Sequence, residues 1–420
     1  MKLGYKQTDV GVIPEDWELG DLHRSMTYAH GKAHEPFVAE WGKYTIVNSK
    51  FIATEGAVKK VVTSNFCPAQ QGDVLMVLSD LPNGRALAKT YTAGSEASML
   101  AVNQRVVRLR PNPMQCDGSY AGYAINRHPY FLKFDDGVTQ THLLNKHLDE
   151  FKFPLPPIKE QRAIAEVLSD VDAEIESLSQ RHEKLVAQKQ GLSEELLSGR
   201  TRLVEPKSKG FKQTDVGMIP EDWEVHELGE LCVKSIRYGI VQPGKYDDQG
   251  RYMLRGQDYS LAKGWARPSD IFRVSKEVEE KYANARVSQG DLVMTIVGYC
   301  GHVELIPDWL DGANLTQTTA RISTDRKLVD SEFMKNELRG QRVQKQVDEN
   351  TKGAAQPGLN CSDVSGFQVV LPPMKEQRAI AEVLSDVDAE IRAVAKLKAK
   401  VQAKKEGLMQ TLLTGKIRLT

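Results

Sequence analysis

A seventeen-residue stretch, KEQRAIAEVLSDVDAEI, occurs twice without a change, at residues 159–175 and 375–391. Other stretches return in the same order along the chain. YKQTDVGVIPEDWEL at 5–19 returns as FKQTDVGMIPEDWEV at 211–225, QGDVLM at 71–76 as QGDLVM at 289–294, and SGRTRL at 198–203 as TGKIRL at 414–419. Similarity that recurs in order marks a duplicated structural unit. The chain is two copies in tandem, each a variable body followed by a nearly constant segment.

Each constant segment predicts a long helix with a heptad seam. A proline pair precedes both segments, and Glu160 and Glu376 fall in the first turn, where acidic side chains suit the helix dipole. Apolar residues then recur in alternating steps of four and three, which is typical of a coiled coil. The seam residues are Ile164, Leu168, Val171, Ile175, Leu178, Leu185, Leu192 and Leu196 in the first copy, and Ile380, Leu384, Val387, Ile391, Val394, Val401, Leu408 and Leu412 in the second.

The two helices are predicted to pair with each other. Residues 159–200 carry nine acidic and six basic side chains, whereas residues 375–418 carry six acidic and ten basic ones. Pairing across a pseudo-twofold axis makes the helices antiparallel, and about forty residues at 1.5 Å rise give a rod of roughly 60 Å. Polar residues interrupt the seam at His182, Lys189, Lys398 and Lys405, and they are either solvated ends of the seam or signals for register and partner choice.

The expected domains are a first body at 1–154, a central helix at 155–200, a linker at 201–210, a second body at 211–370 and a distal helix at 371–420. Each body is expected to be α+β. Strands are predicted within 41–52, 73–80, 103–111, 291–298 and 319–324, and helices at 276–285 and 331–347.

Composition excludes several classes of protein. The chain has 56 basic and 56 acidic residues, so its net charge gives no indication of nucleic-acid binding. Five scattered cysteines, none in a CxxC pair, argue against a disulfide framework and a cysteine zinc site, and favour a cytoplasmic protein. No stretch approaches the roughly 20 apolar residues of a membrane span.

Signatures of catalysis are missing from the sequence. It contains no Walker A, GxGxxG, HExxH or GxSxG motif. His30 and His34 stand four apart, but Gly31 and Pro36 place them in a loop, which disfavours a metal pair. The acidic pairs at 135–136 and 247–248 lie near glycines and favour solvated turns.

Two loops are rich in side chains that can meet DNA. Arg and Lys neutralise phosphates or read guanine, and Gln reads adenine. For any single residue a solvated or packing role is as good an interpretation, but the clusters favour DNA. The candidates in these loops, at 27–37 and 236–260, are Tyr28, His30, Lys32 and His34 in the first copy, and Arg237, Tyr238, Gln242, Lys245, Tyr246, Arg255 and Gln257 in the second. Arg85, and Gln140 and Gln356 in two later glycine-Gln turns, are further candidates outside the loops.

With the proline-led helices, the IPEDWE starts and the variable bodies, the whole chain resembles the specificity subunit of a Type I DNA restriction-modification system. The resemblance implies that each body is a target recognition domain that reads one half of a bipartite, asymmetric site in double-stranded DNA. It implies that the antiparallel helices set the gap between the half-sites and dock two methyltransferase subunits. Motor-nuclease subunits join that core in the family.

The same resemblance implies a non-catalytic chain without a cofactor, because S-adenosylmethionine would bind to the methyltransferase partners. The docking surface is expected on the seam residues 164–178 and 380–394. Two rival hypotheses remain: a stand-alone two-headed DNA-binding or scaffold protein, which would bind DNA tightly without a methyltransferase, and a nuclease with two recognition domains, which would cleave DNA with a metal ion.

Overall fold

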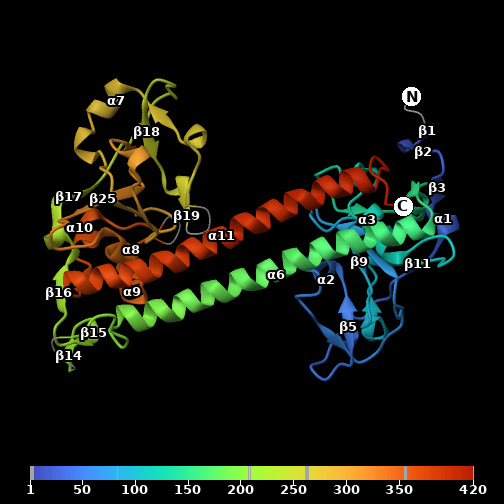
Figure 1. The fold of residues 1–420 in the computed structure, drawn as a ribbon, viewed down its shortest axis with the longest axis horizontal. Coiled ribbons are helices and arrows are strands. Elements are labelled where there is room, and N and C mark those ends of the chain that lie inside the picture. The colour runs from blue at the N-terminus through green and yellow to red at the C-terminus, as the bar shows by residue number, and fades with distance from the viewer. Residues whose placement is uncertain are drawn as a thin grey trace. The chain divides into compact units, whose positions relative to one another are not determined.

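The computed structural model describes residues 4–82, 84–206, 208, 210–260, 264–353 and 357–419. It divides into two compact units, Met1–Ser177 with Lys398–Thr420, and Leu178–Leu397. Each unit holds one body and part of both long helices, α6 (Ile158–Leu197) and α11 (Met374–Leu412) (Figure 1). The predicted fold class, two α+β bodies each followed by a long helix, is confirmed.

Both long helices begin directly after their proline pairs and end before a glycine. Gly199 and Gly415 adopt left-handed backbone angles, φ +69° and +67°, which stop the helices in the manner of a C-terminal glycine. A side chain at either position would also collide with a proline, because a Cβ on Gly199 would lie 2.3 Å from the Cγ of Pro220. The helices are therefore a few residues shorter than the segments predicted at 155–200 and 371–420.

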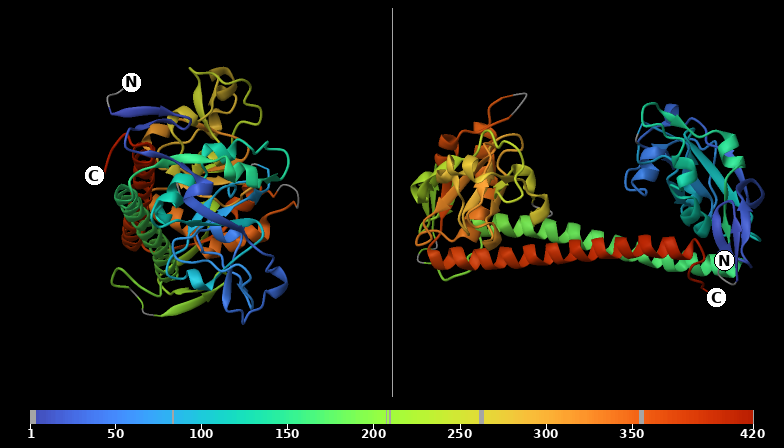
Figure 2. Two further views of the ribbon diagram at one scale, coloured as in Figure 1. Left: turned by 90° about the vertical axis from the view of Figure 1, so that its right-hand side faces the viewer. Right: turned by 90° about the horizontal axis from the view of Figure 1, so that it is seen from above.

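Within each unit, part of α6 runs antiparallel to part of α11, and the two lie side by side in the views of Figures 1 and 2. The lysines that interrupt the seam hold this register. Lys405 Nζ lies 2.5 Å from Asp172 Oδ1 in the first unit, and Lys189 Nζ lies 2.7 Å from Asp388 Oδ1 in the second. The hypothesis of a register signal at Lys189 and Lys405 is supported by these two equivalent ion pairs.

The two bodies share one topology although their sequences differ. Each contains a four-stranded antiparallel sheet with the same strand order, β4-β11-β7-β9 in the first and β17-β25-β22-β23 in the second. The strands are β4 (Met26–His30), β7 (Val74–Val77), β9 (Thr90–Thr92) and β11 (Val106–Pro111), and β17 (Cys232–Tyr238), β22 (Leu292–Thr295), β23 (Val303–Leu305) and β25 (Thr319–Thr324).

Smaller elements complete each body. A three-stranded sheet in each contains one parallel pair, and a hairpin opens each copy. The three-stranded sheets consist of β5 (Tyr44–Val47), β6 (Val61–Val62) and β10 (Leu100–Val102), and of β18 (Arg251–Leu254), β21 (Arg273–Val274) and β24 (Asn314–Leu315). The hairpins are β1 (Tyr5–Thr8) with β2 (Gly11–Pro14), and β14 (Phe211–Thr214) with β15 (Gly217–Pro220).

A last pair of strands joins each body to its helix. β3 (Glu18–Asp21) pairs with β13 (Lys152–Leu155) just before α6, and β16 (Glu224–Glu227) pairs with β26 (Gln368–Leu371) just before α11. The start of each helix then enters the core of its body. Ile164 and Leu168 pack with Trp17 and Leu412 in one apolar cluster, and Ile380 and Leu384 pack with Trp223 and Leu196 in another.

Some predicted elements are wrong in detail. The strand predicted within 41–52 ends at Val47, because Asn48 accepts a hydrogen bond from Phe51 N and begins the helix α2 (Ser49–Ala53). The helix predicted at 276–285 is α7 (Lys276–Glu280) followed by a 3₁₀ turn at Ala283–Ala285. The helix predicted at 331–347 breaks at Gly340 into α8 (Ser331–Arg339) and α9 (Gln341–Asn350).

Candidate nucleic-acid and partner interfaces

The predicted DNA-binding residues of the first body lie in two places. Tyr28 and His30 contact Asp149 and Asn145, and Gln140 contacts Ser79. Tyr28 donates a hydrogen bond to Asp149 Oδ1 at 3.0 Å, and His30 Nε2 lies 2.7 Å from Asn145 Oδ1. Burial, with the Asp149 carboxylate, raises the pKa of Tyr28. Both side chains are half-buried on the same face of β4, and Lys32, two residues after the strand, is exposed.

Gln140 and Arg85 lie on two loops that the pairing of β8 (Ser79–Asp80) with β12 (Thr141–His142) brings together. Gln140 is exposed and donates from Nε2 to Ser79 Oγ at 2.8 Å. Arg85 is exposed too, and its carbonyl accepts a hydrogen bond from Arg127. Both predicted residues are therefore at the surface.

His34 differs from its neighbours because its side chain is fully buried. Its Nε2 accepts a hydrogen bond from Phe66 N at 3.0 Å, and its ring stacks on Phe66 with centroids 5.4 Å apart. These contacts give His34 a packing role in the structure, and they leave no surface by which it meets a ligand.

Most candidates in the second body are exposed. Arg237 and Tyr238 end β17, Gln242, Lys245 and Tyr246 follow on a loop, and Gln257 lies in a 3₁₀ turn at Gly256–Asp258. Arg255 is less free, because its guanidinium forms two hydrogen bonds to Asp258, the shorter at 2.8 Å from Nη2. Gln356 lies outside the described residues. No group of three or more His, Cys, Asp or Glu side chains suited to a metal ion occurs in the part of the chain that the structure describes.

Two buried carboxylates at the helix starts do more than favour the helix dipole. Glu160 accepts hydrogen bonds from Trp17 Nε1 at 3.0 Å and from Arg418 Nε at 2.8 Å. Glu376 accepts the equivalent bonds from Trp223 at 3.0 Å and Arg202 at 2.7 Å. We call this contact of an arginine and a tryptophan with a buried glutamate the arginine clasp. Its residues lie in three stretches that are identical in the two copies: IPEDWE, KEQ and the Arg-Leu pair near the end of each copy. These stretches are the sequence signal that could have revealed the contact.

The seam residues predicted for partner docking are mostly enclosed. Ile164, Leu168, Ile380 and Leu384 are fully buried in the clusters described above, and Val171, Leu178 and Val394 are also buried. Ile175, Val387 and Ile391 are half-buried. These positions hold the helices to each other and to the bodies, as expected of a coiled-coil seam.

A different set of residues is both identical and exposed in the two copies. These side chains recur in steps of three or four and so lie along one face of each helix. We call them the repeated face: Lys159, Arg162, Glu166, Asp170 and Glu174 on α6, and Lys375, Arg378, Glu382, Asp386 and Glu390 on α11.

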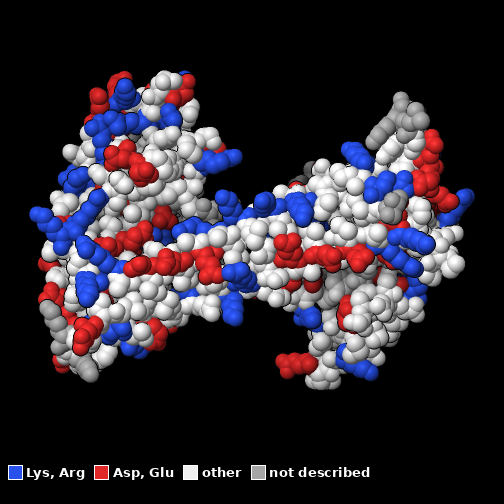
Figure 3. Space-filling model, viewed as in Figure 1, with Lys and Arg blue, Asp and Glu red and all other residues white. Residues whose placement is uncertain are grey.

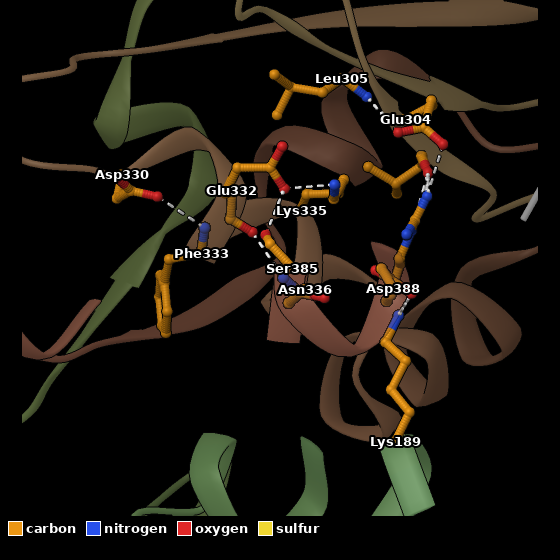
Figure 4. A network of polar contacts seen from close by, with 12 residues as sticks. Lys189, Glu304, Leu305, Asp330, Glu332, Phe333, Lys335, Asn336, Ser385 and Asp388 are labelled. Carbon is orange, nitrogen blue, oxygen red and sulfur yellow. Dashed lines mark hydrogen bonds and ion pairs between the residues drawn. The ribbon is translucent and has the colours of Figure 1, made fainter. Parts of the chain in front are cut away.

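Identity at exposed positions is complete within the seventeen-residue repeat and only partial beyond it, where Lys184 and Lys400 still match. Beyond Ile175, exposed Glu183 corresponds to Ala399, and exposed Gln190 corresponds to Glu406. Inward residues such as Lys189 and Lys405 remain the same because the fold uses them. Figure 4 shows the Lys189–Asp388 pair beside Glu332, whose carboxylate accepts a hydrogen bond from Ser385. The repeated face therefore gives both helices the same exposed side chains.

Comparison with known proteins identifies the family. The Type I restriction modification DNA specificity domain matches twice, over residues 14–187 and 220–403, which together make up most of the chain. The chain therefore belongs to this family, and it carries two recognition domains. It is the specificity subunit of a Type I restriction-modification system, a component that recognises DNA and does not catalyse.

Similar proteins cover nearly the whole chain. The Type I restriction enzyme MjaVIII specificity subunit of Methanocaldococcus jannaschii is 27% identical over 97% of this chain and 94% of its own. The EcoBI specificity subunit of Escherichia coli is 26% identical over 76% of this chain and 68% of its own. The crystal structure of the S subunit from M. genitalium has the same fold, with a TM-score of 0.60 and 15% identity, over 98% of this chain and 99% of that one.

Within the described residues, no helix is long and apolar enough to cross a membrane.

Proposed function

We propose that this chain reads a bipartite, asymmetric sequence in double-stranded DNA, one half with each body, and carries one methyltransferase subunit on each copy of the repeated face. The methyltransferase subunits bind S-adenosylmethionine and methylate adenine, and this chain binds no cofactor. Motor-nuclease subunits join through the methyltransferase subunits when the complex cleaves DNA. The proposed setting is the cytoplasm.

The repeated face is the observation that carries the docking proposal. An exposed side chain away from structural contacts is usually replaceable with a change in stability within about 0.5 kcal/mol. Arg162 and Glu390 form ion pairs with Asp117 and Arg181, but exposed ion pairs contribute little, so stability alone does not require five exposed positions to match across the two copies. Two copies of one partner do require it, because each copy must meet the same complementary surface.

The divergent loops support the reading of two different half-sites. The first body presents Tyr28, His30 and Lys32, and the second presents Arg237, Tyr238, Gln242 and Lys245, on the same sheet framework. Side chains with different donors and acceptors read different base edges. One framework with two different sets of side chains therefore fits an asymmetric target.

The docking proposal predicts a stepwise loss of partners. The chain is co-expressed with the methyltransferase subunit encoded beside it, and the mass of the complex is measured by native mass spectrometry. We expect two bound methyltransferase subunits for the wild-type chain, one for Glu166→Lys or Glu382→Lys alone, and none for the double variant. Each single substitution reverses a charge on one helix, so it weakens binding of the subunit on that helix and leaves the other subunit bound.

A matched control makes the same charge change on the same helices. Glu183→Lys with Glu406→Lys alters exposed positions where the copies differ, and it should retain both partners. A Glu166→Lys, Glu382→Lys chain that keeps two partners would refute docking on the repeated face. A wild-type chain that binds DNA tightly but takes no methyltransferase subunit would favour the stand-alone DNA-binding alternative.

A further inference from the structure

The second body contains an open pocket of about 590 Å³ with a mainly basic lining. Lys234 and Arg237 reach it from β17, Arg321 from β25, and Arg286 from the turn after α7. Asp311 is the acidic residue of its lining. Four cations that line one pocket repel one another unless an anion joins them.

Arg321 is the unusual member of this group because it is buried without an acidic partner. Its side chain belongs to a residue that is only 3% exposed. Nη1 donates to the carbonyls of Asn284 at 2.6 Å and Arg286 at 3.0 Å, Nη2 donates to the carbonyl of Ser235 at 3.1 Å, and Nε has no hydrogen-bond partner among the described residues. A buried charge held only by neutral groups is costly.

Charges of both signs lie near Arg321. Burial lowers the pKa of Arg321, and although Asp291 opposes this shift, the nearby charge of Arg237 adds to it. Arg286 is already neutralised, since its guanidinium forms two hydrogen bonds of 2.6 Å to Glu279. Lys234 and Arg237 are exposed at the mouth of the pocket, and their donors face solvent.

The first body has an equivalent arginine, Arg108, whose neighbouring acid, Asp73, is already bonded to Arg110 at 2.8 Å. Arg108 lies opposite Leu75 and Ala29 in its sheet, as Arg321 lies opposite Val293 and Arg237. There, Asp73 Oδ2 lies 3.9 Å from Arg108 Nε. Both copies therefore have an arginine at the same position of the four-stranded sheet, Arg108 in the first and Arg321 in the second. Only in the second body is the residue opposite it in the adjacent strand another arginine, Arg237.

We propose that this pocket of the second body binds a phosphate group. Lys234 and Arg237 supply the hydrogen-bond donors at its mouth, and the buried charge of Arg321 supplies attraction from below, where low polarity strengthens it. If the proposed DNA reading holds, the phosphate belongs to the DNA backbone beside the half-site that this body reads. Figure 3 shows Lys and Arg side chains gathered over the region where Figure 1 labels β17 and β25.

The test compares the full chain with two double variants of equal charge. Lys234→Gln with Arg237→Gln removes the exposed donors of the pocket and leaves Arg321, whose replacement endangers the fold. Lys327→Gln with Lys345→Gln removes two exposed cations of the same unit outside the pocket. Binding of radiolabelled inorganic phosphate is measured by equilibrium dialysis at low salt, and binding to a random-sequence duplex is measured across salt concentrations.

We expect phosphate binding by the wild-type and control chains and none by the pocket variant. For DNA, losing one phosphate contact should reduce the slope of log affinity against log salt by about 0.9 in the pocket variant alone. Lost phosphate binding with an unchanged DNA slope would assign the site to a free phosphate or phosphorylated small molecule. No phosphate binding by the wild-type chain, or equal losses in both variants, would overturn the proposal. A wild-type chain that binds phosphate but no DNA would refute the proposed DNA reading and leave the pocket assignment standing.

Discussion

At the scale of single residues, the arginine clasp explains why the copies share letters at their starts and ends. Arg418 binds both Glu160 and Asp16, with Asp16 Oδ2 2.7 Å from its Nη2, and its guanidinium lies over the Trp17 ring at 5.6 Å. Arg202, assigned from sequence to the linker, makes the equivalent contacts with Glu376, Asp222 and Trp223. The hydrogen bonds to Glu160 and Asp16 raise the pKa of Arg418.

The clasp predicts a large loss of stability on its removal. Arg418→Met should lower the free energy of unfolding by about 3 kcal/mol, because Glu160 is left buried with its charge unpaired. Arg200→Met, which removes an arginine with an exposed partner, should change it by less than about 1 kcal/mol. Urea unfolding followed by circular dichroism measures both. Equal effects of the two variants would contradict a stabilising clasp.

Acid should weaken the same contact. The hydrogen bond from Arg418 holds the pKa of Asp16 below its ordinary value in the folded chain. Such a group adds stability above its unfolded pKa of about 3.9, and this stability is lost as the pH falls through the lower folded value. The difference in stability between wild type and Arg418→Met should therefore shrink below about pH 4.

Sequence patterns revealed some residue roles and concealed others. The burial of Ile164 and Ile380 follows from the heptad pattern, because periodicity shows which helix face is inward. The pattern does not show what covers that face, so residues of the body cores were predicted as partner surface. Burial of His34 against Phe66 and pairing of Arg255 with Asp258 depend on tertiary contacts, and no local pattern indicates them.

At the scale of elements, the equivalent pairs Lys189–Asp388 and Lys405–Asp172 fix how α6 and α11 align. The Lys189 and Asp388 side chains are 19% and 15% exposed, so water screens their attraction only in part. A shift of either helix by one heptad would separate both pairs. A polar contact inside an apolar seam commonly specifies register in this way, at some cost in stability.

Charge reversal tests this function of the seam lysines. Lys189→Asp should lower the free energy of unfolding by about 1 to 2 kcal/mol, because it sets two carboxylates against each other, and adding Asp388→Lys should recover most of the loss. Arg181→Glu, opposite exposed Glu390, should cost less than about 1 kcal/mol. If the double exchange stays as unstable as the single variant, the pair does not specify the register.

At the scale of the whole molecule, two different reading bodies are combined with two equivalent helices. The seventeen identical residues make this plan visible from the sequence. Because every residue of the run is identical, however, the comparison of the two copies does not show which residues are buried and which are exposed. The structure separates them, because Glu160, Gln161 and Leu168 are buried while Arg162 and Glu166 are exposed. The heptad pattern predicts the inward seam, but the exposure of each remaining position, such as Arg162 and Glu166, comes from the structure.

The most direct measurement maps methylated adenines in a host without other DNA modification, after co-expression of this chain with its methyltransferase subunit. We expect a split motif, two short blocks around a fixed unspecified gap. A heptad inserted at matched places in α6 and α11 adds about 10.5 Å, so at about 3.4 Å per base pair the gap should grow by about three base pairs. A continuous palindromic motif would contradict the proposal that the two bodies read two half-sites, and a gap that the insertion leaves unchanged would contradict the proposal that the helices set the gap.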